Sequence, residues 1–455
     1  MASTTKPNNL MISVSGIRGK IPEGLFLDNI ILYTNAFIEA IYPRTVVIGR
    51  DSRPSGNYIE HLITGILLSK GIDVISLGIV PTPTLKAVVK STNSSGGIMI
   101  SASHNPIEWN AFKFVGKNGF FFNAPQLQNL LSHAEKKDFR DIKHFPKSKN
   151  KTNSTDYIEL HIESVLKRVD VAKIRKRKFK VFLDAVNGAG SEVVPLLLGK
   201  LNCKVDKLYC DTDKPFPREP EPTPHSLQKS AKFMKKTSAE IGLALDPDAD
   251  RLVLLTPKRG CISEEYTLPL SMESVLPNKK NNIVINLSSS FINDEIASRY
   301  GKTTLRAPVG EANVVSEMLL SKAFFGGEGN GGVIDPEINS FGRDSLSGIA
   351  HILNVLAIRN IDIDKYLDTY PEIFMKKETI PVKGKDLNLI KSKLRNTYLI
   401  HPADQRDGLR ISLPNSWFHV RASNTEPILR VIAEAKSEAD LTILLKNINL
   451  VIKGA

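Results

Sequence analysis

The chain has 455 residues, of which 41% are hydrophobic and 24% charged, so it is long enough for about three globular domains with buried cores. It contains no apolar run near the roughly 20 residues of a membrane helix, and its polar start, residues 1–9, lacks the apolar segment of a secretory signal. The three cysteines, Cys203, Cys210 and Cys261, show no metal-ligand spacing, which favours a reduced, cytoplasmic compartment.

The formal net charge is +13, and much of the excess lies in two segments, Lys136–Lys151 and Lys167–Lys180. Such segments can bind nucleic-acid phosphates. Because no aromatic stacking pattern or recognition helix accompanies them, a solvated surface is the better interpretation. We therefore expect neither a nucleic-acid nor a membrane partner, and a positive field that attracts a small anionic substrate.

Strands and helices alternate through the first 153 residues. Strands are predicted at Met11–Val14, Thr45–Gly49, Val74–Leu77 and Ile98–Ile100, and helices at Asp28–Ile41, Tyr58–Ser69 and Thr84–Lys90. This order implies right-handed crossovers and a mostly parallel sheet, with ligands at the carboxyl ends of its strands. The loops Ser15–Gly19 (S-G-I-R-G) and Ser101–Asn105 both follow strands, so we expect them on the same rim.

The second of these loops lies in the stretch Gly96–Pro106, which reads G-G-I-M-I-S-A-S-H-N-P and exposes Ser103. A serine hydroxyl is a poor nucleophile unless a base, a metal or a phosphate group already attached to it changes its chemistry, and the adjacent His104 is the local helper. Taken alone, the loop is equally explained by the turn preferences of Ser, Asn and Pro. Downstream loops decide the matter.

A second α/β unit follows the basic, polar stretch Lys136–Thr155. Its predicted helices are Asp156–Lys167, Ser191–Leu201 and Ser226–Lys236, and its predicted strands are Lys180–Leu183, Val205–Tyr209, Ile241–Leu245 and Leu252–Leu255. The loop between the last two strands reads D-P-D-A-D-R, Asp246–Arg251.

Three carboxylates at alternate positions of this tight loop repel one another unless a cation lies among them. Asp246, Asp248 and Asp250 therefore predict a Mg²⁺ site with room for a phosphate oxygen. An EF-hand is excluded, because Arg251 and Pro257 stand where Gly and Glu are required. A phosphatase that uses Asp246 as its nucleophile remains an alternative.

The third and fourth units carry loops suited to a sugar and to a phosphate. The third is predicted to have strands at Ile283–Leu287 and Ala323–Phe325 and helices at Ser290–Tyr300 and Glu311–Lys322. It continues into G-G-E-G-N-G-G, Gly326–Gly332, where Glu328 and Asn330 offer hydrogen bonds to hydroxyls. The fourth is predicted to have strands at Glu378–Val382, Gly408–Leu413, Trp417–Arg421 and Ile428–Lys436 and helices at Leu387–Arg395 and Ala439–Ile452. Its loop R-A-S-N-T-E-P, Arg421–Pro427, can hold a phosphate.

Taken in order, these loops resemble the α-D-phosphohexomutase family, which includes phosphoglucomutase/phosphomannomutase and phosphoglucosamine mutase. The likeness covers essentially the whole chain, with W-N-A-F-K-F (Trp109–Phe114) and S-G-I-R-G in support of the four main motifs. It implies three similar α/β domains with mixed sheets and a smaller C-terminal α+β domain around a central cleft. We expect these domains at 1–153, 154–260, 261–374 and 375–455.

The resemblance also implies an isomerase that interconverts hexose 6-phosphate and hexose 1-phosphate through a phosphoserine and a hexose bisphosphate, which is both intermediate and activator. Ser103 matches the family's phosphoserine. Asp246, Asp248 and Asp250 match its Mg²⁺ ligands, and an oxygen of the phosphoserine completes the protein's part of the coordination shell. The residues that match positions lining this centre are Arg18, His104, Lys113 and Arg251. The residues expected to hold the substrate are Glu328, Asn330, Arg421, Ser423, Asn424 and Thr425. Lys113 and His104 are the candidates for handling the hydroxyl proton.

The chain departs from the family pattern in two places. Many relatives read G-E-x-S-G-H at the sugar loop, whereas this chain has Asn330 for the serine and Gly332 for the histidine, so any role of that histidine is absent or supplied elsewhere. Ser101 stands where threonine is usual, which leaves it as an alternative modified residue. By resemblance, G-E-A-N-V (Gly310–Val314) and the last loop favour glucosamine phosphate over glucose and mannose phosphates. We expect a small phosphosugar as partner and a monomer or homodimer.

Overall fold

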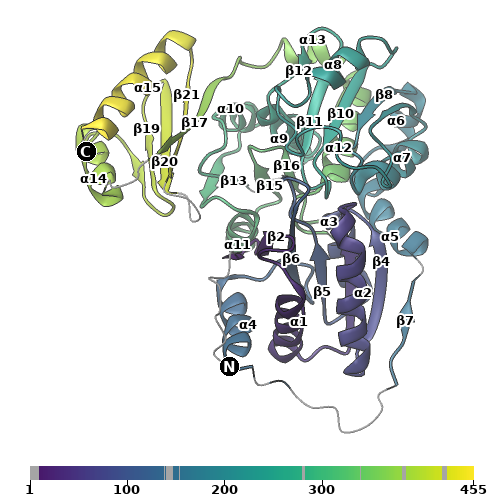
Figure 1. Ribbon diagram of the computed structural model, residues 1–455. Helices are drawn as coiled ribbons and strands as arrows, with labels where there is room; N and C mark the ends of the chain where they lie inside the picture. The colour runs from purple at the N-terminus through teal and green to yellow at the C-terminus, as the bar shows by residue number, and fades with distance from the viewer. Residues whose placement is uncertain are drawn as a thin grey trace.

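The computed structural model describes residues 10–137, 139, 147–152, 154–278, 282–338, 340–381, 386–422 and 428–454. The chain builds four units, each around its own sheet, and the fourth lies to one side of the other three (Figure 1). The predicted fold class, three α/β domains with mixed sheets and a C-terminal α+β domain, is confirmed. Among the described residues, no helix is both long and apolar enough to cross a membrane.

The first sheet has seven strands in the order β1-β2-β6-β5-β3-β4-β7. The strands are β1 (Leu10–Ser13), β2 (Gly16–Lys20), β3 (Thr45–Arg50), β4 (Asp73–Ile79), β5 (Gly96–Ile100), β6 (Trp109–Gly116) and β7 (Asn150–Lys151). β3 is parallel to β4 and β5, whereas β1, β2 and β6 add on antiparallel. The expectation of a mostly parallel sheet is therefore wrong for this unit, because the chain returns from β5 directly into β6 without a crossover helix.

Helices cover both faces of this sheet. They are α1 (Leu27–Ile41), α2 (Pro54–Ser69), α3 (Thr82–Ser91) and α4 (Ala124–Lys136). Because successive strand residues point to opposite faces, Val46 and Ile48 of β3 join the core under α1, α2 and α4, while Val47 joins the core with α3. The sheet is thus fixed from both sides, and the carboxyl end of β5 is held rigidly.

The second unit places the predicted acidic loop in a hairpin. Its sheet runs β12-β11-β10-β8-β9, with β8 (Lys180–Asp184), β9 (Lys204–Leu208), β10 (Ile241–Leu245), β11 (Leu252–Thr256) and β12 (Gly260–Cys261). Its helices are α5 (Ser154–Leu166), α6 (Val171–Arg177), α7 (Gly190–Lys200) and α8 (Gln228–Met234). β10 pairs antiparallel with β11, so residues 246–251 form the connection at the end of a buried strand.

The third unit has the sheet order β14-β13-β15-β16. Its elements are α9 (Thr267–Met272), β13 (Ile283–Asn286), α10 (Ile292–Arg299), β14 (Thr304–Ala307), α11 (Glu311–Ser321), β15 (Phe325–Glu328), β16 (Gly332–Ile334), α12 (Ser345–Arg359) and α13 (Ile363–Leu367). Helix α12 is buried over most of its length, and its residues belong to a core that also contains residues of α3, α5 and β10. One continuous apolar core therefore joins the first three units.

The fourth unit has a separate core. Its sheet runs β17-β21-β20-β19-β18 and is antiparallel throughout, with β17 (Phe374–Pro381), β18 (Ala403–Asp404), β19 (Leu409–Ser412), β20 (Ser416–Ala422) and β21 (Ile428–Ala435). The helices α14 (Leu387–Thr397) and α15 (Glu438–Lys453) pack on it. Because this core does not merge with the shared one, the unit contacts the rest mainly through polar side chains such as Lys377, Arg410 and Glu434.

Candidate active site

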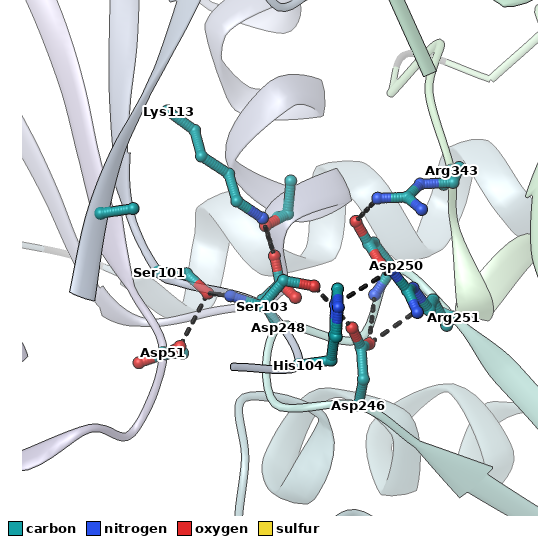
Figure 2. Close-up of polar contacts among 12 residues, drawn as sticks. Asp51, Ser101, Ser103, His104, Lys113, Asp246, Asp248, Asp250, Arg251 and Arg343 are labelled. Atoms are coloured by element: carbon teal, nitrogen blue, oxygen red, sulfur yellow. Dashed lines mark hydrogen bonds and ion pairs between the residues drawn. The ribbon is translucent and has the colours of Figure 1, made fainter. Parts of the chain in front are cut away.

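The loop after β5 presents Ser103 to the acidic loop of the second unit (Figure 2). Ser103 has φ 51, and its amide donates to Ser101 Oγ at 2.9 Å. Ser101 Oγ in turn donates to Asp51 Oδ2 at 2.7 Å and is fully buried. Ser103 Oγ donates to Asp246 Oδ2 at 2.9 Å. Ser101 Oγ is thus committed to hydrogen bonds within the first unit, whereas Ser103 Oγ faces the acidic loop.

Arg53, which the sequence analysis did not identify, holds the Ser103 loop in place through its backbone carbonyls. Its side chain is fully buried and donates to the carbonyls of Ser103 and Asn105, each at 2.6 Å, and of Trp109 at 3.1 Å. Its Nε lies 3.0 Å from Asp51 Oδ2. A guanidinium satisfies several carbonyls at once because its donors form a rigid fork. The only sequence signal was its place in R-D-S-R-P directly after a predicted strand.

Removing this guanidinium should destabilise the protein. Arg53→Ala leaves the buried Asp51 carboxylate unpaired and several carbonyls without donors, so we expect the free energy of unfolding to fall by about 3–5 kcal/mol. Chemical denaturation measures the change. Arg177→Ala, which breaks a partly exposed pair with Glu240, is the control and should cost about 0–1 kcal/mol. Equal losses in the two variants would contradict the assignment.

The three aspartates of the acidic loop are fully buried, and one oxygen from each lies within 4.8 Å of the others. Asp246 Oδ1 accepts from the amides of Asp250 and Arg251 at 3.1 and 3.2 Å. Oδ1 of Asp248 and Oδ1 of Asp250 have no hydrogen-bond partner among the described residues. Burial and the two neighbouring carboxylates raise the pKa of Asp246 well above its ordinary value. Three buried carboxylates this close together, two of which have an oxygen without a hydrogen bond, fit a hard divalent cation.

Cationic and hydroxyl groups from two other units partly balance this charge. Lys113 Nζ and Thr82 Oγ1 both lie 2.5 Å from Asp248 Oδ2, and Arg343 Nη2 lies 2.5 Å from Asp250 Oδ2. Burial alone would raise the pKa of Asp248, but the charge and hydrogen bond of Lys113, with the Thr82 bond, hold it below its usual range. Asp248 thus stays ionised and docks the acidic loop onto the first unit.

His104 presents a neutral ring to the site. Arg251 Nη2 donates to His104 Nδ1 at 3.0 Å, which places the ring proton on Nε2. The charge of Arg251, then burial and the charge of Arg18, lower the pKa of His104 well below its usual value. Arg18 donates to Asn105 Oδ1 at 3.1 Å. These side chains therefore offer donors suited to phosphate oxygens.

A cavity of about 420 Å³ brings the candidate residues together, a size suited to a small ligand. The candidates among its lining residues are Arg18, Ser103, His104, Lys113, Arg251, Glu328, Asn330 and Arg421. All four units contribute, as a central cleft requires. Ser423, Asn424 and Thr425 lie outside the described residues.

The sugar loop carries a fixed carboxylate and a free amide. Glu328 Oε1 accepts from Asn286 Nδ2 and from the amide of Gly310, both at 2.8 Å. Asn330 Oδ1 is buried and has no partner among the described residues, so it can accept a hydrogen bond from a ligand hydroxyl. Arg421 lies across the cavity on β20, with its Nε 3.5 Å from Asp407 Oδ2.

Arg343, Glu265 and Lys377 also line the cavity, and no motif pointed to them. Glu265 Oε2 accepts from the amide of Ser290 at 2.9 Å, and its Oε1 lies 3.2 Å from Lys377 Nζ of β17. Burial raises the pKa of Glu265 to about 7, against the opposing charge of Lys377. This ion pair joins the fourth unit to the third at the edge of the cavity.

The raised pKa of Glu265 should make stability depend on pH. Since the folded-state pKa exceeds that of an unfolded glutamate, the stabilising contribution is complete below about pH 4.5 and is lost as pH rises through about 7. Relative to Glu265→Gln, the wild-type protein should lose up to about 3 kcal/mol between pH 5 and pH 8. Melting of both proteins at the two pH values measures this, and other titrating groups cancel in the comparison. An unchanged difference would refute the assignment.

The fold and the site together define an enzyme of the phosphohexomutase class, an isomerase. Three family models, described as phosphoglucomutase/phosphomannomutase α/β/α domains I, II and III, match residues 10–141, 159–260 and 264–373. A fourth, described as the phosphoglucomutase/phosphomannomutase C-terminal domain, matches residues 377–450. The chain belongs to the phosphoglucomutase/phosphomannomutase family. The finer boundaries drawn from the sequence at residues 153, 260 and 374 stay predictions.

Individual relatives agree with this assignment over nearly their full length. The chain is 36% identical over 400 residues to a phosphoglucomutase/phosphomannomutase of Thermococcus kodakarensis, covering 86% of each chain. It is 32% identical to a phosphoglucosamine mutase of Methanococcus vannielii, covering 98% of this chain and 99% of the relative. A crystal structure of a phosphoglucomutase/phosphomannomutase family protein from Burkholderia thailandensis superposes with a TM-score of 0.83 at 26% identity, covering 98% of both chains.

Proposed function

We propose that this phosphohexomutase interconverts glucosamine 6-phosphate and glucosamine 1-phosphate, with Ser103 as the residue that carries the phosphoryl group. The observation that supports this most directly is the contact of Ser103 Oγ with Asp246 Oδ2 at the wall of a cavity lined by cations. A phosphorylated Ser103 would carry roughly −1.5 to −2 charges. Arg18, Lys113 and Arg251 lie around the cavity to offset that charge.

The residues of the acidic loop fit Mg²⁺. Asp246, Asp248 and Asp250 would hold the ion, together with an oxygen on Ser103, because two of their buried oxygens lack partners among the described residues. A bound Mg²⁺ supplies a positive charge that stabilises the transferring phosphoryl group. Arg343 and Lys113, which hold Asp250 and Asp248, keep these carboxylates in place for that role.

Phosphoryl transfer between Ser103 and the sugar is a substitution at phosphorus. The Ser103 Oγ–P bond breaks, a bond forms between phosphorus and a free sugar hydroxyl oxygen, and that hydroxyl loses its proton. Catalysis of such transfers depends mainly on alignment and charge stabilisation. His104 Nδ1 is occupied by Arg251, so His104 can donate from Nε2 but cannot take the proton at Nδ1. Lys113 Nζ is an ammonium paired with Asp248 Oδ2, so it can donate a proton but cannot accept one. The proton of the sugar hydroxyl would therefore pass to an oxygen of the transferred phosphoryl group.

The product of this first transfer is a hexose bisphosphate, which must turn end for end before Ser103 recovers a phosphoryl group. A second phosphate site is needed to hold the non-reacting end in both orientations. Arg421 would bind the non-reacting phosphate, because its side chain lines the same cavity from β20 of the fourth unit. Ser423, Asn424 and Thr425 are proposed to complete it. Glu328 and Asn330 would meanwhile bind the sugar hydroxyls.

The choice of glucosamine phosphate is supported by the likeness to a relative named phosphoglucosamine mutase, and glucose and mannose phosphates remain the alternatives. Coupled turnover assays with the 1-phosphates of glucosamine, glucose and mannose test it directly. We expect the highest kcat/KM for glucosamine 1-phosphate. A higher value for either neutral sugar would overturn the substrate but not the class of reaction.

We also propose that the enzyme is cytoplasmic and that it is a monomer or a homodimer. The three cysteines are free, which supports a reduced, cytoplasmic compartment. All four units contribute to the cavity from one chain, so a monomer would be sufficient for activity and a homodimer is compatible with it. Light scattering on the purified protein measures the oligomeric state.

A further inference from the structure

Arg343 connects the acidic loop to the sugar loop through one side chain. Its Nη2 lies 2.5 Å from Asp250 Oδ2, and its Nη1 lies 3.2 Å from Glu328 Oε2. Its Nε faces Glu311 Oε2 at 3.4 Å. Figure 2 shows the guanidinium reaching Asp250 from the third unit. Because a guanidinium holds its donors in one rigid plane, moving either carboxylate disturbs the other.

The backbone on both sides of Arg343 is anchored. A Cβ on Gly342 would lie 1.8 Å from Lys86 Nζ and 2.5 Å from Glu311 Oε1, so the chain runs directly against that buried ion pair. Asp344 is the N-cap of helix α12, and its Oδ2 lies 2.8 Å from Nε2 of the buried His161. Arg343 is therefore delivered to the cavity from a fixed point rather than from a free loop.

The aliphatic stem of Arg343 fills the space above Gly332. A Cβ built on Gly332 would lie 2.3 Å from Arg343 Cδ and 2.8 Å from Arg343 Cγ. These atoms are the middle of the side chain, so they cannot move away without displacing the guanidinium. A side chain at position 332 and the present course of Arg343 are therefore mutually exclusive.

We propose that Gly332 and Arg343 act as a matched pair, in which Arg343 is a positioning residue that holds Glu328 for the sugar and Asp250 for the divalent cation. This inference rests on the proposed function, and it assigns the pair a role in setting both the sugar KM and the Mg²⁺ requirement. Position 332 must then be glycine, because the stem of Arg343 occupies the space that a side chain there would need.

A double-mutant cycle tests the pair. Arg343→Ala should lower kcat/KM by about 10–100-fold and raise both the sugar KM and the Mg²⁺ concentration for half-maximal activity. Gly332→Ala should lower kcat/KM roughly 10-fold in the wild-type background, because it displaces the guanidinium. In the Arg343→Ala background the same change should cost less than about twofold. Equal factors in the two backgrounds would overturn the proposal.

Two further variants make the result unambiguous. Gly65→Ala is the matched control and should leave turnover unchanged, since, apart from its chain neighbours and the adjacent backbone of its own helix, no heavy atom of the described residues lies within 4 Å of the added Cβ. Arg343→Lys keeps the charge but loses the fork, so the Mg²⁺ requirement should rise even if Arg343→Ala fails to fold. A Lys variant with wild-type KM and Mg²⁺ requirement would refute the positioning role.

The rise in melting temperature on adding Mg²⁺ separates this inference from the proposed function. If the wild-type protein shows no mutase turnover, the proposed function is wrong, but the inference about Gly332 and Arg343 is not yet contradicted. The pair would still be supported if the Mg²⁺-dependent rise is smaller in Gly332→Ala and in Arg343→Lys than in the wild-type protein. Identical rises in all three proteins would count against the pair whatever the turnover.

Discussion

Ser103→Ala is expected to abolish mutase turnover, with kcat lowered by more than about 10⁴-fold, as when a nucleophile is removed from other enzymes. The reason is geometric as well as chemical. Ser103 Oγ is the hydroxyl that the loop directs at Asp246, and Arg53 holds the loop by donating to the carbonyls of Ser103, Asn105 and Pro106. Coupled turnover measures the loss, and intact-protein mass should show one phosphoryl group in the wild-type protein and none in the variant.

Ser101→Ala is the control for this experiment. Ser101 Oγ is committed to Asp51 and to the Ser103 amide, so its loss should loosen the loop and lower turnover without removing the phosphoryl group. A phosphoryl group that maps to Ser101 would contradict the assignment. Turnover that survives Ser103→Ala but disappears in Asp246→Asn would instead favour an aspartate nucleophile.

Asp248→Asn is expected to have the second largest effect, with turnover at a fixed Mg²⁺ concentration lowered by roughly 10²–10³-fold. The substitution removes one charge from the proposed cation site and leaves the buried Lys113 ammonium without its counterion. We therefore also expect a loss of about 3–5 kcal/mol in the free energy of unfolding. Turnover titrated with Mg²⁺, and again after chelation by EDTA, measures the first effect, and chemical denaturation measures the second.

A matched surface variant controls for the change of aspartate to asparagine. Asp211 pairs with Lys214 on the surface of the second unit, so Asp211→Asn should leave the Mg²⁺ dependence unchanged. A wild-type Mg²⁺ titration in Asp248→Asn, or full turnover of the native enzyme in EDTA, would show that the acidic loop is not the cation site.

The functional groups of the loops could be predicted because each loop is a short, contiguous sequence motif. D-P-D-A-D-R places three carboxylates in one tight turn whatever surrounds it, and strand periodicity located the turn directly after β10. The same applies to the glycine-rich stretch that contains Glu328, which the structure places at the end of β15 and in the turn into β16. The alternation of strands and helices likewise indicated the α/β class.

Sequence periodicity did not predict the strands and helices whose structure depends on the elements packed around them. Strand β6, which carries Lys113, mixes polar and aromatic residues and was recognised only as a motif. Because it pairs antiparallel with both β2 and β5, it turns an expected parallel sheet into a mixed one. Helix α12 is buried over most of its length, so it lacks the polar face that marks an amphipathic helix in sequence.

The sequence by itself determined the fold class, the order of the four loops and the residue types that each brings to the cavity, because these depend on spacing along the chain. Only the tertiary structure decided which charges meet. Arg53 under the Ser103 loop, and Arg343 between Asp250 and Glu328, satisfy partners far away in sequence. Their roles follow from burial, since a buried carboxylate or carbonyl needs a donor and any unit of the fold can supply it.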